Sequence, residues 1–517
     1  PSTDQRGFKR IAGKYQDIGA VEFGSEEMPP QDEIFHTPPV QPKPTPQPDS
    51  LPIDANGLTP GVNESNVGFQ RYQFTTPINL QAPLKDEAPI LQGGMADRWM
   101  STEVAVVDRS FSLEYEQHLN LSGSGEIDIQ QLQDTLKQAK QQQGVVTAII
   151  YVVFVPRDAD PAGKTQIATN RQPQDDDRLQ LILVPPVGKP IYRLLDVQRS
   201  QVISQAKLFR TTVSDPEDDR SYIPLAQQFY SWLLAPLKQD LDAQNITSLI
   251  YCLDEGLRTI PLAAMHDQQQ FVIEKYAISV IPSIALARLN VASLSTRKVV
   301  AMGAEKFASL EPLPAVPIEL NLIRDNFPDS KVLLNDAFTR TNLLKSKQEE
   351  RPNILHLATH AEFNPGNAQQ SYIQLWDGRL NLDQVRSLNW NPGELSLLTL
   401  SACTTAVGSR EAELGFAGLA AAAGVRSTLG SLWTVSDLGT LALMSQFYDH
   451  LNTTSSIAEA LRKTQLALLK GSVRIEQGAL QVGNRVVPLD AKLKPPQSAQ
   501  LRHPFYWSAF TLVGNPW

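Results

Sequence analysis

Three apolar runs in the last third of the chain restrict its fold more than any other feature. They read NILHLATH (353–360), ELSLLTLSAC (394–403) and VRSTLGSLW (425–433), and each stops at a polar cluster. Such continuous runs are typical of parallel strands that are buried on both faces. The second run leads into helix-forming sequence at 411–424 and the third into another at 437–451. Alternating strands and helices predict an α/β fold with a mostly parallel sheet.

The rest of this block extends the pattern. Apolar runs predict strands over 298–303 and 330–335, and helical spacing predicts a helix over 339–348. The segment HPFYWSAFTLVG (503–514) predicts a final strand, and residues 471–500 form a polar insert before it.

An earlier block has the same character. The β-branched, apolar runs at 145–156, 179–186 and 246–254 predict strands. Residues 223–241 repeat apolar side chains at helical spacing and predict one long helix. We therefore expect two folded parts, 96–296 and 297–517.

The first 95 residues differ in composition from the rest of the chain. Of the chain's 37 prolines, 14 lie in the first 89 residues. Proline blocks helix and ladder formation and favours extended polyproline II. Residues 1–95 are therefore predicted to be a largely disordered linker or tail. Because the sequence begins at Pro1 without a signal-peptide pattern, we expect a fragment or a processed product, with the location open between cytoplasmic and exported.

Charge and apolar run length exclude some functions. The formal net charge is −9 and no Lys/Arg block stands out, which argues against nucleic-acid binding as the main function. The longest apolar run, 145–155, is too short for a membrane span of about 20 residues. A protein or peptide substrate, in particular a basic one, would suit this acidic chain better than a nucleic acid.

Two residues with side chains that could act in catalysis stand at the ends of predicted strands. His360 closes the first of the three runs and Cys403 closes the second. Ligands of open parallel sheets bind beyond the carboxyl ends of the strands, so we expect the imidazole and the thiol to meet there. A thiol beside histidine is a nucleophile, and the backbone N–H groups of Cys403 and Ala361 could receive the developing oxyanion.

Other interpretations of these residues are weaker. Cys252 lies inside an apolar run and is predicted to be a buried structural thiol, and two cysteines exclude a disulfide framework. His356 and His360 have the spacing of zinc ligands on a helix, but the segment is a predicted strand without the HExxH glutamate, so we expect no metal. His356 is expected to be buried and structural. Ser401 lacks the flanking glycines of a serine-hydrolase elbow.

Four segments together resemble the CHAT family of caspase-like domains. They are HLATHAEF (356–363), LSACTTAVG (400–408), ELGFAGLAAAAGVRSTLGSLWTVSD (413–437) and HPFYWSAFTLVG (503–514). The resemblance covers roughly residues 145–517. It implies an α/β/α caspase-like sandwich in which a pseudo-caspase half precedes an active half.

The resemblance also implies an activity. It suggests a cysteine endopeptidase that needs no cofactor, with His360 and Cys403 as its catalytic dyad. Many relatives have glycine after the histidine, where this chain has Ala361, but a backbone N–H remains there. The tetratricopeptide repeats that often precede the domain are absent from this sequence, so a regulatory protein or an upstream region is an open possibility. Some relatives of cyanobacterial type carry the domain after a long exported region. The rival hypothesis is a non-catalytic interaction or regulatory module of the same fold.

Asp437 closes the third motif and is the candidate for substrate specificity. In separase-like relatives a similar Trp-containing segment ending in Asp receives a basic P1 side chain, which implies cleavage after arginine. The structural alternative is an N-cap for a helix beginning at Leu438. If Asp437 does not serve, Asp377 and Glu413 are the next candidates for the acid of the pocket.

Overall fold

The computed structural model describes residues 95–159, 172–218, 220–291, 297–388, 390, 395–405 and 409–517, and the side chains within these ranges except those of 95–102, 386 and 402–405. By internal contacts the chain divides into Pro1–Ile78 and Asn79–Trp517, and every described element belongs to the second unit. The predicted Pro-rich tail lies outside the described residues except for Met95, which begins the first helix.

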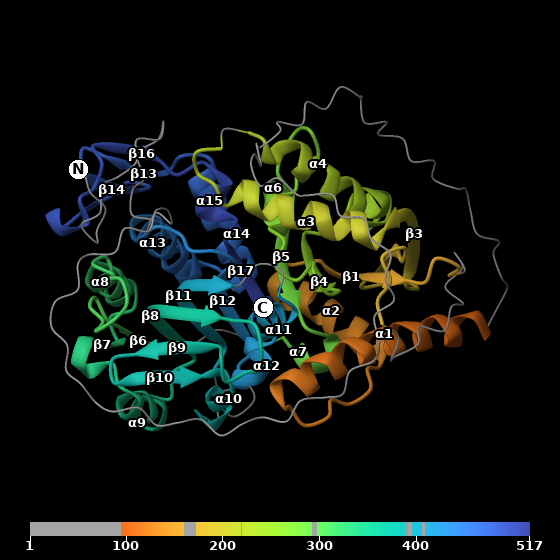
Figure 1. Cartoon of the computed structure of the whole chain (residues 1–517), viewed down its shortest axis with the longest axis horizontal. Helices are drawn as coiled ribbons and strands as arrows, with labels where there is room; N and C mark the ends of the chain where they lie inside the picture. Colours follow the sequence, from red (N-terminus) through yellow and green to blue (C-terminus); the bar gives the residue numbers. More distant parts are fainter. Residues whose placement is uncertain are drawn as a thin grey trace, which may run out of the picture. The chain divides into compact units, whose positions relative to one another are not determined.

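One large mixed sheet organises the second unit. Its strand order is β10-β9-β8-β11-β12-β17-β5-β4-β1-β2-β3, with β6 paired to β8 and β7 paired to β6. Strands from both predicted halves therefore share this sheet (Figure 1). Most neighbouring pairs are parallel, and antiparallel pairs occur towards both ends and at β12–β17. The expected α/β class with a mostly parallel sheet is confirmed.

The first part of the chain supplies five strands. They are β1 (Thr147–Val155), β2 (Arg178–Val184), β3 (Ile191–Gln198), β4 (Ser248–Leu253) and β5 (Ala277–Ile281). β1, β4 and β5 are buried along their whole length, which explains their continuous apolar sequences.

The long helix predicted over 223–241 is wrong in one respect. The structure has α4 (Tyr222–Leu233), a 3-10 turn at Ala235–Leu237 and then α5 (Lys238–Ala243). Pro236 explains the break, because proline lacks the N–H that a continuous helix needs and disfavours a helical residue before it.

The later part supplies the remaining strands of the sheet. They are β6 (Val299–Gly303), β7 (Lys331–Leu334), β8 (Ile354–Phe363), β9 (Tyr372–Leu375), β10 (Gly378–Asn381), β11 (Leu397–Thr405), β12 (Ser427–Ser431) and β17 (Phe510–Gly514). The three long apolar runs at 353–360, 394–403 and 425–433 all form strands, and these strands, β8, β11 and β12, are neighbours in this order.

The predicted strand over 503–514 is only half correct. His503 caps a short helix, α15 (Pro504–Trp507), by accepting from the Phe505 N–H, and β17 follows. Proline in the first helical turn favours this start, which the apolar pattern alone does not reveal. β17 runs antiparallel to β12 and parallel to β5, so the parallel strands of the two parts run in opposite directions.

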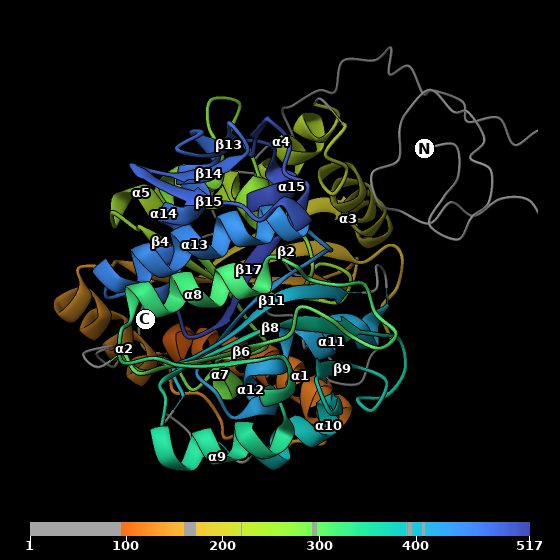
Figure 2. The same cartoon turned by 90° about the vertical axis from the view of Figure 1, so that its left-hand side faces the viewer.

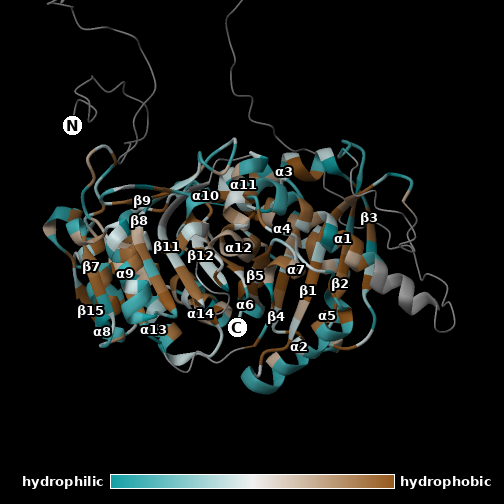
Figure 3. Ribbon diagram, turned by 90° about the horizontal axis from the view of Figure 1, so that it is seen from below, coloured by the Kyte–Doolittle hydropathy of each residue, from teal (hydrophilic) through white to brown (hydrophobic). Residues whose placement is uncertain are grey.

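Helices cover both faces of the sheet (Figures 1 and 2). One face carries α3 (Arg199–Val213), α4, α6 (Val272–Lys275), α8 (Val316–Asn326), α13 (Asp437–Thr453) and α14 (Ile457–Leu469). The other carries α1 (Met95–Leu119), α2 (Ile129–Gln143), α7 (Ile284–Ala287), α9 (Arg340–Glu350), α10 (Leu382–Val385), α11 (Arg410–Ala417) and α12 (Leu419–Ala423). Figure 3 shows hydrophobic residues concentrated on the strands and polar residues on the outer helices, as expected of an α/β/α sandwich.

The polar insert before β17 has its own small sheet. Its strands are β13 (Val473–Glu476), β14 (Ala479–Val482), β15 (Arg485–Pro488) and β16 (Ser498–Gln500), and all its pairs are antiparallel.

Candidate active site

The two predicted catalytic residues lie on adjacent parallel strands. In the register of β8 and β11, His360 is the partner of Ala402 and Ala361 is the partner of Cys403. His360 and Cys403 are therefore one residue out of step across the same ladder. The adjacency expected from the sequence is found. The approach of the imidazole to the sulfur stays a prediction, because the Cys403 side chain lies outside the described residues.

An irregularity in the ladder lies next to this pair. Leu400 pairs with Leu357, whereas Ala402 pairs with His360, so β8 has one more residue than β11 between the two pairs. Such a bulge redirects the side chains that follow it and is common beside active sites. Strict strand alternation therefore does not carry through from Leu357 to His360.

The His360 side chain is half-buried and held by a segment that follows β6. Its Nε2 atom lies 2.8 Å from the carbonyl oxygen of Glu311, and the Phe307 ring packs edge-on against the imidazole with centroids 5.0 Å apart. A carbonyl oxygen can only accept, so Nε2 carries the hydrogen in this contact. In the neutral ring Nδ1 then has the free lone pair.

Sequence reasoning missed Glu311 and Phe307. They lie in a loop about 50 residues before His360, and Glu311 contributes a backbone atom that any residue type provides. No side-chain motif could have signalled this contact.

Ala361, the second predicted oxyanion donor, lies inside β8. It pairs with Cys403 on one side and with Ile373 of β9 on the other, and it is buried. β8 extends three residues past His360 and β11 two residues past Cys403, so neither residue closes its strand as the sequence suggested, and Ala361 lies within β8 rather than beyond it. The Ala361 N–H must be free of these ladders if it is to act as an oxyanion donor.

His356 is buried and structural, as predicted. Its Nδ1 atom lies 2.9 Å from the Tyr448 hydroxyl, and its Nε2 lies 2.9 Å from Oε1 of the buried Glu319. The Tyr448 hydroxyl also donates to Thr399 on β11. This buried cluster ties β8 and β11 to α8 and α13 beneath the candidate site.

Asp437 is not the N-cap of the following helix, the structural role predicted as the alternative to substrate binding. α13 begins at Asp437 itself, and the cap is Ser436, whose side chain accepts from the Gly439 N–H. Asp437 Oδ2 accepts the Ala315 N–H at 2.7 Å, at the start of α8. Burial, and to a smaller extent the charge of Glu319, raise the pKa of Asp437 to about 7, although the Ala315 hydrogen bond opposes the shift.

The segment between β6 and α8 links Asp437 to His360. Glu311 contacts His360, and Ala315, four residues later, donates to Asp437. Both predicted functional residues therefore contact the same short stretch of chain.

The two reserve candidates for the acid of the specificity pocket are engaged elsewhere. Both carboxylate oxygens of the exposed Asp377 lie 3.2 Å from the Arg340 N–H at the start of α9. Glu413 is buried, and it accepts from the Gly256 N–H at 2.9 Å and the Thr259 hydroxyl at 3.4 Å.

Cys252 is a buried free thiol in β4, as predicted. Burial is the main cause that raises the pKa of its thiol well above the usual value, and the nearby Asp108 adds to the shift. A thiol with a raised pKa is a poor nucleophile at neutral pH.

The described residues show neither a metal site nor a membrane span. No three His, Cys, Asp or Glu side chains in the described ranges are arranged to hold a metal ion. None of the described helices is both long and apolar enough to cross a bilayer.

The fold and the candidate site together define a class of protein. It is an α/β/α sandwich that carries a histidine and a cysteine on adjacent strands of its sheet. The model of the CHAT domain matches residues 224–515, which is more than half of the chain. The chain therefore belongs to the CHAT domain family, as the sequence motifs implied.

Comparison with solved structures gives distant similarities. Two structures of the Saccharomyces cerevisiae separase–securin complex match with TM-scores of 0.41, at 9% and 10% identity, over 81% of this chain. The chain spans about a third of those chains, 33% and 34%. The complex of the pro- and mature domains of Porphyromonas gingivalis RgpB matches with a TM-score of 0.34 at 11% identity, over 62% of this chain and 77% of that one. Comparison with curated proteins gives no match.

Proposed function

We propose that this protein is a cysteine endopeptidase in which His360 activates Cys403. The observation that supports this most directly is the pairing of β8 with β11, which has His360 level with Ala402 and one residue from Cys403. The hydrogen bond from His360 Nε2 to the Glu311 carbonyl adds to it, since a base held in one tautomer by a third group is the usual arrangement in such dyads.

The chemistry follows from this tautomer. Nδ1 of His360 takes the thiol proton, and the sulfur of Cys403 attacks the peptide carbonyl to form a C–S bond. The imidazolium then returns the proton to the leaving amine as the C–N bond breaks, which leaves a thioester. Water, deprotonated by the same imidazole, hydrolyses the thioester and restores the thiol. The Cys403 N–H is the proposed oxyanion donor, joined by the Ala361 N–H if that group is released from its ladder.

Replacing either member of the dyad tests the proposal. Cys403→Ala and His360→Ala should each abolish peptide cleavage, and the double variant should be no worse than either single one, because residues that act as a unit are not additive. The measurement is hydrolysis of a fluorogenic peptide, with circular dichroism to verify folding. Full activity of Cys403→Ala would refute the dyad.

The second cysteine provides a matched control. A peptidyl acyloxymethyl ketone should label Cys403 and leave the buried Cys252 unmodified, as read by peptide mass spectrometry. Cys252→Ser should lose some stability and keep turnover. A well-folded chain that is neither labelled nor active would instead favour the non-catalytic interaction module.

Asp437 is the proposed acid of the P1 pocket. Its carboxyl group is only partly buried and contacts the segment that also holds His360. A carboxylate can form two charge-assisted hydrogen bonds with arginine, which lysine cannot reproduce. We therefore expect cleavage after Arg, more slowly after Lys, and poorly after Asp.

The sharper variant for this test is Asp437→Asn. Asparagine keeps an oxygen that can accept the Ala315 N–H, so the contact with α8 survives while the charge is removed. In a P1-varied fluorogenic library the variant should lose at least about tenfold in kcat/KM for Arg, the equivalent of about 1.4 kcal/mol. A wild-type preference for Asp or apolar P1 residues, or an unchanged Arg preference in the variant, would remove Asp437 from this role.

A further inference from the structure

A cavity of about 210 Å3 lies where α3, the loop after β4 and the start of α11 meet. Four of its lining residues are cationic, and only two acids, Glu255 and Glu413, face them; the cations are Arg199, Lys207, Arg210 and Arg410. An excess of positive charge repels a basic side chain, so this cavity is not the proposed P1 pocket. No sequence motif signals it, because its residues come from segments that span more than 200 positions of the chain.

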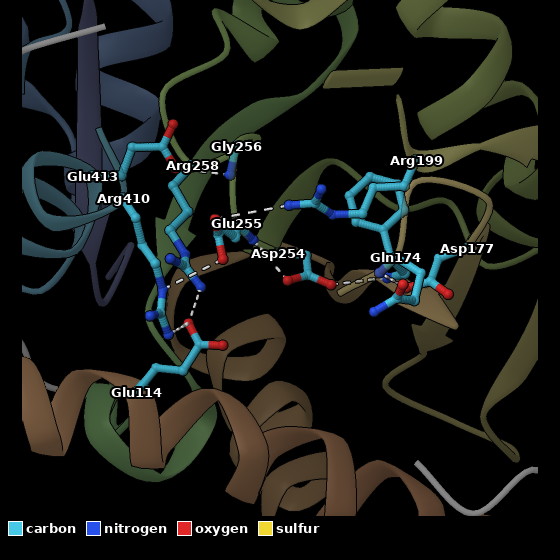
Figure 4. A network of polar contacts seen from close by, with 11 residues as sticks. Glu114, Gln174, Asp177, Arg199, Asp254, Glu255, Gly256, Arg258, Arg410 and Glu413 are labelled. Carbon is cyan, nitrogen blue, oxygen red and sulfur yellow. Dashed lines mark hydrogen bonds and ion pairs between the residues drawn. The ribbon is translucent and has the colours of Figure 1, made fainter. Parts of the chain in front are cut away.

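Glu255 lies between two arginines, and its distance to each is longer than a normal charge-assisted hydrogen bond. Its carboxylate oxygens lie 3.7 Å from Arg199 Nη2 and 3.4 Å from Arg410 Nε (Figure 4). Charge-assisted N–H···O bonds are normally about 2.7–2.9 Å long. In the described part of the chain neither guanidinium has a shorter polar contact, and the buried Arg199 Nε has no hydrogen-bond partner there. Both groups therefore have N–H donors to spare.

Glu413 does not neutralise the cavity either. Its two oxygens accept from the Gly256 N–H and the Thr259 hydroxyl, and burial raises the pKa of its carboxyl group. Nearby, Glu114 is engaged by the fully buried Arg258 (Figure 4). The acids of this region are thus committed to the protein itself.

Arg210 and Lys207 are the other two cationic residues that line the cavity. Arg210 is buried and donates to the Leu432 carbonyl, just after β12; burial lowers the pKa of its guanidinium to about 10, so it stays charged at neutral pH. Lys207, one turn earlier on α3, is exposed at the rim.

We propose that this cavity binds a small oxyanion of the phosphate class. Guanidinium donors match the geometry of phosphate oxygens, and four cations facing two acids leave an excess of at least two positive charges, which suits a dianion. The volume lies below the roughly 300–1,000 Å3 of pockets for drug-sized ligands, so the site takes one anionic group rather than a whole nucleotide. Its walls include the start of α11, the helix that follows the Cys403 strand, and its Arg210 donates to the carbonyl of Leu432, just after the neighbouring strand β12.

Titration of the full chain with inorganic phosphate tests this directly. Calorimetry at pH 7.5, with sodium chloride matching the ionic strength, should show saturable binding, and phosphate should raise the melting temperature above the chloride control. Lys207→Glu and Arg410→Gln should each weaken the affinity at least about tenfold. Lys207 is exposed and its replacement leaves the core untouched, so this variant serves even if Arg410→Gln fails to fold.

The control is Arg474→Gln. Arg474 pairs with Glu476 on the small sheet and does not line the cavity, so its loss should leave phosphate binding unchanged. Absence of saturable binding, or equal affinity in all variants, would overturn the proposal. A second arm uses a peptide with two adjacent glutamates and the same peptide with glutamines. Binding of the acidic peptide without binding of phosphate would also overturn it. No readout depends on proteolysis, so these outcomes are independent of the proposed peptidase activity.

Discussion

At the scale of single residues, Asp437 and His360 illustrate how backbone groups set the state of a side chain. The Ala315 N–H favours the ionised form of Asp437, but the desolvation by burial is larger and raises its pKa to about 7. The Glu311 carbonyl decides which nitrogen of His360 carries hydrogen. Neither partner can be identified by residue type, because each contributes a main-chain atom.

The raised pKa of Asp437 predicts a pH dependence of stability. The folded protein holds this proton up to about pH 7, whereas the unfolded chain loses it near 3.8. Between these values the native state binds more protons, so this carboxyl lowers the free energy of unfolding as pH rises. Asp437→Asn should remove that trend and, relative to wild type, gain up to about 3 kcal/mol between pH 4.5 and pH 8, at about 1.4 kcal/mol per pKa unit. Urea unfolding of both proteins at several pH values measures it.

Asp134→Asn is a control for which stability should change with pH in the opposite direction. Asp134 is exposed on α2, and its hydrogen bond with Lys137 lowers its pKa. Its stabilising contribution is present above the unfolded pKa and is lost as pH falls, so this variant should lose stability relative to wild type as pH rises from 3 to 5. A difference between wild type and Asp437→Asn that is the same at every pH would contradict the assignment.

At the scale of elements, the apolar runs correctly predicted that strands form, but they did not predict where those strands end. The strands β8, β11 and β12 lie within one to three residues of the predicted starts, because both faces of each are buried. β8 continues past His360 because Ala361 and Glu362 find partners on both β9 and β11. That pairing is tertiary and leaves no local pattern.

The helices show the same limit. The continuous helix-forming sequence at 411–424 folds as two helices, α11 and α12, which meet at Gly418. A Cβ at Gly418 would crowd Leu119 and Tyr115 of α1, so this glycine permits close packing of α11 and α12 against α1. The sequence contains the glycine but not the neighbour that requires it.

For the candidate site, the sequence predicted the strands of His360 and Cys403 and their adjacency. It could not predict the bulge in β8 or the Glu311 contact, both of which depend on segments brought together by folding. The cationic cavity escaped prediction for the same reason: Arg199, Glu255 and Arg410 are unremarkable in their own segments.

At the scale of the whole sheet, β17 joins the strands of the two parts. It pairs with β12 over five residue pairs and with β5 on its other side. Gly514 is its last residue and pairs with Ser427, with φ at +113°. A Cβ there would clash with the Arg426 carbonyl oxygen and the Ser427 Cα, both of them backbone atoms that cannot turn aside.

Gly514→Ala should therefore destabilise the protein by about 2–4 kcal/mol, the combined effect of left-handed strain and a backbone clash. Gly483→Ala is the matched control, since Gly483 also has positive φ but open space around its Cβ position. The control should lose only about 1 kcal/mol. Thermal and urea unfolding compare the two. Equal losses would mean that close packing at the β12–β17 junction contributes nothing.

The position of β17 also sets an order of events during biosynthesis. It is the last of the described strands of the large sheet to leave the ribosome, yet it lies between strands made long before it. Until residues 510–514 emerge, β12 and β5 both present unpaired edges, and open edges invite pairing with other chains. Before β17 is made, the strands that carry His360 and Cys403 are not joined to β5, and the open edges of β12 and β5 make this the stage most exposed to aggregation.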